Sequence, residues 1–122
     1  MIKLVFCLRR LPHLSREEFH RYWLDTHGPL VRELAPALGV KRYTQVHTVT
    51  SAFSEAMRRH RGAPEDFDGV AELWWDDYPA TVAALSSAET MAAVADHANF
   101  MDSHDKCAMF ITEEVVIVEG RN

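Results

Sequence analysis

The chain of 122 residues is 48% hydrophobic and 25% charged, which is typical of one globular domain and argues against disorder. Its net charge of -5 disfavours a nucleic-acid-binding surface, and no apolar run approaches the roughly 20 residues of a membrane helix. The apolar start is too short for a secretory signal, and the two cysteines form neither a metal-type nor a disulfide pattern. We therefore expect a single domain over residues 1–122, located in the cytoplasm.

The first periodic segments are a strand and a helix. Apolar and branched side chains alternate over residues 2–8, which predicts a β-strand. Ser15 and Glu18 match a capping box, in which each side chain satisfies a backbone N–H of the first turn, so a helix should follow. Gly28-Pro29 is expected to break this helix, because proline removes a backbone donor and disfavours helical geometry just before it. A second short helix should then run to Leu38.

The middle of the chain predicts two strands separated by a long connection. Alternating side chains over residues 40–49 and again over residues 68–75 indicate the strands. Residues 51–66 are polar and include Gly62 and Pro64, so we expect a long irregular loop there.

The last third of the chain predicts helical structure and then a final strand. Residues 79–85 indicate a short helical turn, and Ser86 to Glu89 match a second capping box that should open a helix to about Met101. Residues 109–118 are almost continuously apolar, which is typical of a strand covered on both faces.

This β-α-β-β-α-β order predicts an α+β, ferredoxin-like sandwich, with a four-stranded antiparallel sheet and helices on one face. Both faces of the predicted sheet carry apolar groups, since Leu4 and Phe6 alternate with Val5 and Cys7. The helices of one chain cannot cover both faces. A second copy packed sheet against sheet is the simplest cover, so we expect a homodimer.

Several segments resemble the EthD family, in the family's order along the chain. The stretch from Phe19 to Leu30, an aromatic pair followed by His-Gly-Pro-Leu, is similar to the family's opening helix. Residues 42–47, 68–75 and 110–118 resemble its later strands. The resemblance implies a dimeric α/β barrel, in which two ferredoxin-like chains join their sheets. It also implies a range of reactions, because relatives include small monooxygenases, haem-degrading enzymes, isomerases and polyketide cyclases.

Three residues are candidates for catalysis: His27, His47 and Tyr43. Histidine is the usual acid or base near neutral pH, and the resemblance implies that His27 lies at the pocket end of the first helix. Alternatively, His27 caps that helix. Tyr43, Gln45 and His47 share one strand face, where buried polar groups need partners or a ligand. Alternatively, that face meets solvent at a sheet edge.

Four further residues are candidates for substrate binding: Tyr22, Gln45, Glu72 and Trp75. Tyr22 and Trp75 would supply flat walls of a pocket. Glu72 would be a base of raised pKa, or would pair with Arg9 or Arg42 across the sheet or the dimer seam.

No metal or cofactor is predicted. The histidine pairs His20–His27 and His97–His104 are each seven residues apart, whereas zinc-binding pairs on a helix lie three or four apart. A histidine alone does not specify haem, and the chain has no Gly-rich phosphate loop.

The leading hypothesis is a cofactor-independent dehydratase, isomerase or cyclase, or monooxygenase, acting on a small aromatic or polyketide-like molecule. The alternative is a non-catalytic dimeric binding protein of a catabolic pathway, because the chain contains no self-sufficient catalytic motif. Haem-linked oxygenation is a third hypothesis.

Overall fold

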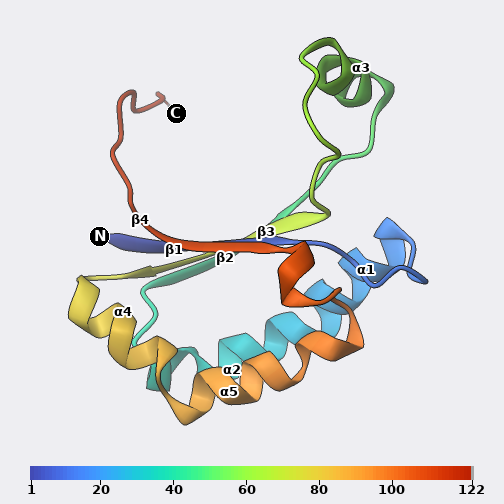
Figure 1. The fold of residues 1–122 in the computed structure, drawn as a ribbon. Helices are drawn as coiled ribbons and strands as arrows, with labels where there is room; N and C mark the ends of the chain where they lie inside the picture. The colour runs from blue at the N-terminus through green and yellow to red at the C-terminus, as the bar shows by residue number, and fades with distance from the viewer. Residues whose placement is uncertain (122) are drawn as a thin grey trace.

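The computed structural model describes residues 1–121, which are built around one antiparallel sheet with strand order β2-β3-β1-β4 (Figure 1). The strands are β1 (Ile2–Leu8), β2 (Arg42–His47), β3 (Gly69–Trp75) and β4 (Ala108–Glu113). Strands β1 and β3 are central, whereas β2 and β4 are the edges. The alternation in β1 sends Leu4, Phe6 and Leu8 to the buried side, as the period of two requires.

Helices cover only one face of the sheet, here called the inner face (Figure 1). They are α1 (Arg16–Tyr22), α2 (Gly28–Leu38), α4 (Tyr78–Leu85) and α5 (Ala88–Ala95). Helix α3 (Ala52–His60) stands apart on the opposite side, above the outer face. The sheet order and the one-sided helices confirm the predicted ferredoxin-like α+β fold.

The first helix begins where the sequence predicts but does not break at Gly28-Pro29. The Ser15 hydroxyl accepts from the Glu18 amide, and the Glu18 carboxylate accepts from the Ser15 amide. A π-helical turn over Trp23–His27 then joins α1 to α2, with the Gly28 N–H donating to the Trp23 carbonyl. The predicted break is therefore wrong: the wider turn carries the chain into α2 with Pro29 in its first turn, where a backbone donor is dispensable.

Three other predicted boundaries are also wrong. Residues 51–66 include helix α3 and are not an irregular loop throughout. The Ser51 hydroxyl caps this helix by accepting from the Ser54 amide. Helix α5 is capped by Ser87 instead of Ser86, and it ends at Ala95 before two short 3-10 turns. Strand β4 ends at Glu113, well short of residue 118.

The core lies between the inner face and the helices. Phe6, Leu8, Phe19, Trp23 and Phe100 form its larger cluster, in which the Phe19 and Phe100 rings lie 5.6 Å apart. A second cluster, around Leu4, Leu38 and Trp75, packs toward the other end of the sheet. Full burial of one such side chain contributes about 1.5–3 kcal/mol.

The outer face of the sheet is only partly covered. Val46 and Phe110 are about half exposed there. Trp74 is buried on this face beneath Lys3 and Arg42, whose charged groups lie 4.9 and 5.0 Å from its ring. Beyond β4, residues 114–119, here called the tail segment, leave the sheet on this same side (Figure 1).

Candidate functional site

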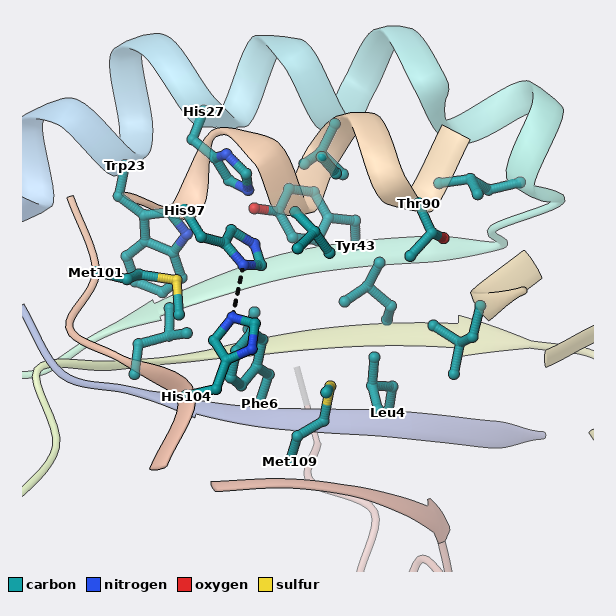
Figure 2. Close-up of a pocket in the computed structure, with 18 of the residues that line it drawn as sticks. Leu4, Phe6, Trp23, His27, Tyr43, Thr90, His97, Met101, His104 and Met109 are labelled. Atoms are coloured by element: carbon teal, nitrogen blue, oxygen red, sulfur yellow. Dashed lines mark hydrogen bonds between the residues drawn. The ribbon is translucent and has the colours of Figure 1, made fainter. Parts of the chain in front are cut away.

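A cavity of about 300 Å³ lies between the inner face and helices α2 and α5 (Figure 2). Its lining is mainly apolar, with Leu4 and Phe6 from β1, Leu73 and Trp75 from β3, and Val31 from α2. That volume is at the lower end of the range for small-molecule pockets. Figure 2 shows that His27, His97, His104 and the Tyr43 hydroxyl gather at one end and face the same space, whereas Thr90 lies apart from them.

His27 is buried at this end and is held by Asp96. Its Nδ1 lies 2.9 Å from Asp96 Oδ2, and the residue is 5% exposed. Asp96 Oδ1 also accepts from the Tyr22 hydroxyl at 2.7 Å and from Asn99 Nδ2 at 2.9 Å. An ionised Asp96 only accepts hydrogen bonds, so the pattern assigns the His27 proton to Nδ1. The Nε2 lone pair is then the one available to a molecule in the cavity.

Burial acts in opposite directions on the pKa values of His27 and Asp96. Burial lowers the pKa of His27, and the Asp96 carboxylate only partly offsets this effect. Burial would raise the pKa of Asp96, but hydrogen bonds from Tyr22, Asn99 and His27 hold it below its usual value. Near neutral pH, the pair is therefore an uncharged imidazole oriented by a carboxylate, which is the arrangement of a general base and its orienting group.

His97 and His104 form a second pair beside the first. The His97 Nδ1 and His104 Nε2 atoms are 3.3 Å apart (Figure 2), and the His97 ring centroid lies 5.3 Å from that of His27. Burial, together with the neighbouring His27 and His104, lowers the pKa of His97 to about 4. His97 is therefore neutral over most of the pH range and can exchange hydrogen bonds with a ligand without adding charge.

The three polar residues of β2 have different surroundings. Tyr43 lines the cavity, and burial raises the pKa of its hydroxyl, which therefore stays protonated. Gln45 Nε2 donates to the Trp23 carbonyl at 2.8 Å and to the Tyr43 oxygen at 3.0 Å, so it ties β2 to the π turn. His47 lies 2.9 Å from Gln45 Oε1 and stacks on the Trp23 indole at 4.7 Å, and it does not line the cavity.

The predicted substrate-binding residues Trp75, Tyr22 and Glu72 do not lie together in one site. Trp75 lines the cavity, with its indole N–H donating to the Leu38 carbonyl at 2.9 Å. Tyr22 stacks on Phe100 and contacts Asp96, so it supports His27 rather than forming a cavity wall. Glu72 points to the outer face, away from the cavity. It pairs there with Lys3 at 2.9 Å, and within residues 1–121 of the single chain its partner is this lysine rather than either predicted arginine.

Sequence reasoning missed Asp96 and did not join His97 and His104 to this site. Asp96 is 69 residues from His27, and it carries no local motif beyond its position after α5. The two histidines drew attention only as a weak metal pair. Among residues 1–121, no group of three or more His, Cys, Asp and Glu side chains is arranged to hold a metal ion.

The sheet order, the one-sided helices and the apolar cavity define a ferredoxin-like domain with a cluster of histidines and a tyrosine at one end of that cavity. The chain matches the EthD domain over residues 11–104, and it belongs to this family. The resemblance seen in the sequence is thereby confirmed. No helix in the described part of the chain is both long and apolar enough to cross a membrane.

Solved structures share this fold at low sequence identity. An EthD family protein from Bacillus halodurans aligns with a TM-score of 0.65 and 22% identity, over 94% of this chain and 100% of the other. A dimeric protein of unknown function with a ferredoxin-like fold, from Bacteroides fragilis, aligns with a TM-score of 0.64 and 11% identity, over 93% of this chain and 95% of the other. SnoaB, a cofactor-independent oxygenase from Streptomyces nogalater, aligns with a TM-score of 0.55 and 16% identity, over 97% of each chain.

Proposed function

We propose that this protein is a cofactor-independent enzyme that moves a proton on an aromatic or polyketide-like molecule bound in the cavity. The observation that carries the proposal is the buried Asp96–His27 pair, whose second ring nitrogen faces an apolar cavity. The description of SnoaB as a cofactor-independent oxygenase adds support, because such chemistry occurs on this fold.

The arrangement of Asp96, His27 and Tyr43 around the cavity suggests the chemical steps. His27 Nε2 takes a proton from an acidic C–H or hydroxyl of the substrate, and Asp96 stabilises the imidazolium that forms. The Tyr43 hydroxyl donates to the oxygen on which negative charge develops. Return of the proton to another carbon is an isomerisation, and its return to a leaving hydroxyl is a dehydration. An enolate left in the cavity is also the electron-rich species that an oxygenation would require.

The lining also suggests the shape of the substrate. The histidines and the Tyr43 hydroxyl lie at one end, and apart from Thr90, whose hydroxyl donates to the Ala84 carbonyl, the rest of the wall is formed by apolar side chains such as Leu4 and Leu73. A flat apolar ring system with an oxygen function at one end fits this division, because it leaves no ligand polar group without a partner.

We further propose that two copies pair through their outer faces, in the cytoplasm. The half-exposed Val46 and Phe110, on the two edge strands of that face, support the pairing, because the sheet of a second copy would cover both. The dimeric state of the Bacteroides fragilis protein agrees with it. The free thiols of Cys7 and Cys107 are compatible with a reducing compartment.

Proton abstraction is measurable without knowing the natural substrate. 2-Tetralone is a bicyclic ketone with one aromatic ring and acidic C–H groups beside its carbonyl, and its deuterium uptake in D₂O is followed by NMR. We expect wild-type protein to accelerate uptake and His27→Ala to lower the rate by about 10²–10⁴-fold, the usual contribution of a general base. His47→Ala is the matched control, because this histidine lies outside the cavity and its loss should leave the rate within a few-fold.

Two results would contradict this assignment. Equal rates for wild-type and His27→Ala protein would remove His27 as the base. Saturable binding of 2-tetralone with no exchange would instead favour the non-catalytic binding protein.

A further inference from the structure

His97 and His104 form a pair that the proposed chemistry does not yet use. They come from separate 3-10 turns, over His97–Asn99 and His104–Lys106, and His97 Nδ1 lies 3.3 Å from His104 Nε2. A hydrogen bond between two neutral imidazoles requires one nitrogen to carry the proton and the other to accept it. Either ring can take either part, so the pair is able to pass a proton in both directions.

The pair extends the position of His27 toward solvent. His27 is 5% exposed, His97 is partly buried and His104 is exposed. The ring centroids of His27 and His97 are 5.3 Å apart, and those of His97 and His104 are 5.5 Å apart. Figure 2 shows the His97 ring between the other two. Three imidazoles therefore lie in a row of increasing exposure, with the proposed base at the buried end.

Aromatic rings hold this row in place. The Phe6 ring centroid lies 5.7 Å from that of His97 and 6.0 Å from that of His104. The Phe100 ring lies 4.9 Å from His27 and 6.1 Å from His97. Such contacts restrict how far each imidazole can tilt away from its neighbour. Proton transfer between side chains requires short, aligned distances, and fixed rings maintain them.

A buried base needs an exit for the proton that it takes. Burial lowers the pKa of His27, so its imidazolium form is unstable in the cavity and gives up the proton readily. If no other acceptor is near, the proton returns to the carbon that it left. Replacement of a substrate hydrogen by a solvent hydrogen therefore requires a path from His27 Nε2 to water.

We propose that His97 and His104 relay protons between His27 and bulk solvent, one outward and one inward in each turnover. This inference rests on the proposed function. A bridging water carries the proton from His27 Nε2 to His97 Nε2, across the gap between these two rings. His97 then gives its Nδ1 proton to His104 Nε2, and the exposed His104 releases its Nδ1 proton to solvent.

The outward passage prepares the inward one. Afterwards, His97 and His104 each carry their proton on Nε2, so the hydrogen bond between them is reversed. His104 takes a solvent proton on Nδ1 and returns its Nε2 proton to His97 Nδ1. His97 then releases its Nε2 proton toward His27 and the substrate. Both histidines end with the proton on Nδ1, as they began, and the charge of the pair is unchanged.

Deuterium uptake by 2-tetralone in D₂O, measured at constant pD in low and in high buffer, tests the relay. In low buffer, His104→Ala should lower the uptake rate by about tenfold or more, because a positioned proton carrier is lost. Added HEPES should restore the rate by exchanging protons with His97 at the exposed end of the row. The charged sulfonate of HEPES keeps it out of the apolar cavity. The wild-type rate should not depend on the buffer.

Three further variants separate a relay from a supporting role. Glutamine in His104→Gln keeps a hydrogen-bond partner for His97 but cannot carry a proton, so its rate should fall and recover with buffer as that of His104→Ala does. His60→Ala, at an exposed histidine of α3, is the matched control and should stay within about twofold of wild type. His27→Ala should remain slow at every buffer concentration, because the base itself is missing.

The possible outcomes distinguish the relay from the proposed function. Wild-type rates in both His104 variants, with His27→Ala slow, would overturn the relay and leave the proposed function intact. A loss in His104→Ala that His104→Gln repairs, or that buffer does not restore, would make His104 a support for His97 and would also overturn the relay. Uptake no faster with wild-type protein than without it would overturn both.

Discussion

Replacing Gly69 with alanine should destabilise the protein, because the new methyl group would meet the Trp23 indole. A Cβ at Gly69 would lie 2.9 Å from Trp23 Cη2, closer still to Cζ3, and 3.1 Å from the Val46 carbonyl oxygen. The indole is 1% exposed and is held between the Phe19 ring at 5.6 Å and the His47 ring at 4.7 Å. It therefore has little room to move away.

Two opposing effects set the magnitude. Alanine is favoured over glycine within a strand by about 0.5–1 kcal/mol, because glycine loses more backbone entropy on folding. Overpacking a core costs about 1–3 kcal/mol. The steric cost is the larger, so we expect a net loss of about 1–2 kcal/mol. With an unfolding entropy of about 2.1 cal/mol/K for each of the 122 residues, this loss corresponds to a fall in Tm of about 4–8 °C.

Urea and thermal unfolding, followed by circular dichroism at one protein concentration, measure this effect. Gly120→Ala is the matched control, because its added Cβ would have no neighbour within 4 Å. In a Trp23→Phe background, the smaller ring should make Gly69→Ala less costly, which isolates the contact as a coupling between the two positions. A Gly69→Ala protein as stable as wild type would refute the steric argument.

Two further predictions concern ionisation. His97 should titrate with a pKa of about 4 by NMR, and stability should fall as the pH drops from about 6.5 to about 4, because the unfolded chain binds that proton first. A pKa near 6.5 would contradict the effect assigned to its partly buried position beside His27 and His104. Hydrogen bonds from Arg10 and Arg16 outweigh burial and lower the pKa of Asp68, so its stabilising effect should be complete above pH 4 and lost below it. Asp68→Asn should therefore cost about 2 kcal/mol in urea unfolding at pH 7 and progressively less as the pH falls below 4, and a cost that does not change with pH would count against this account.

Local features of the sequence were enough to predict the architecture. The alternation over residues 2–8 depends only on the strand period, and the Ser15–Glu18 box depends on groups three residues apart. Such signals are complete within one turn or one strand, so they hold whatever packs around them. Together with the EthD resemblance, they were sufficient for the order of elements and for helices on one face.

The ends of the helices and strands depended on tertiary contacts, which local sequence patterns do not contain. Gly28-Pro29 has the composition of a helix break, but the π turn and the Gln45 bond to the Trp23 carbonyl keep the helix continuous. The run of residues 115–118 has the composition of a strand, but in the single chain no neighbour pairs with it. A strand requires a partner for its hydrogen bonds, and composition alone cannot say whether that partner is present.

The candidate site likewise divides into residues that the sequence predicted and residues that only tertiary contacts placed. The place of His27 at the cavity followed from the EthD resemblance, and that of Tyr43 and Trp75 on the inner face followed from the alternation along their strands. Asp96, which orients His27, and the separation of His47 from the cavity followed only from the packing of α5 against α2 and of β2 against the π turn. A contact between residues 69 positions apart leaves no periodic trace in the chain, because it is created by the approach of two elements that each fold for their own local reasons.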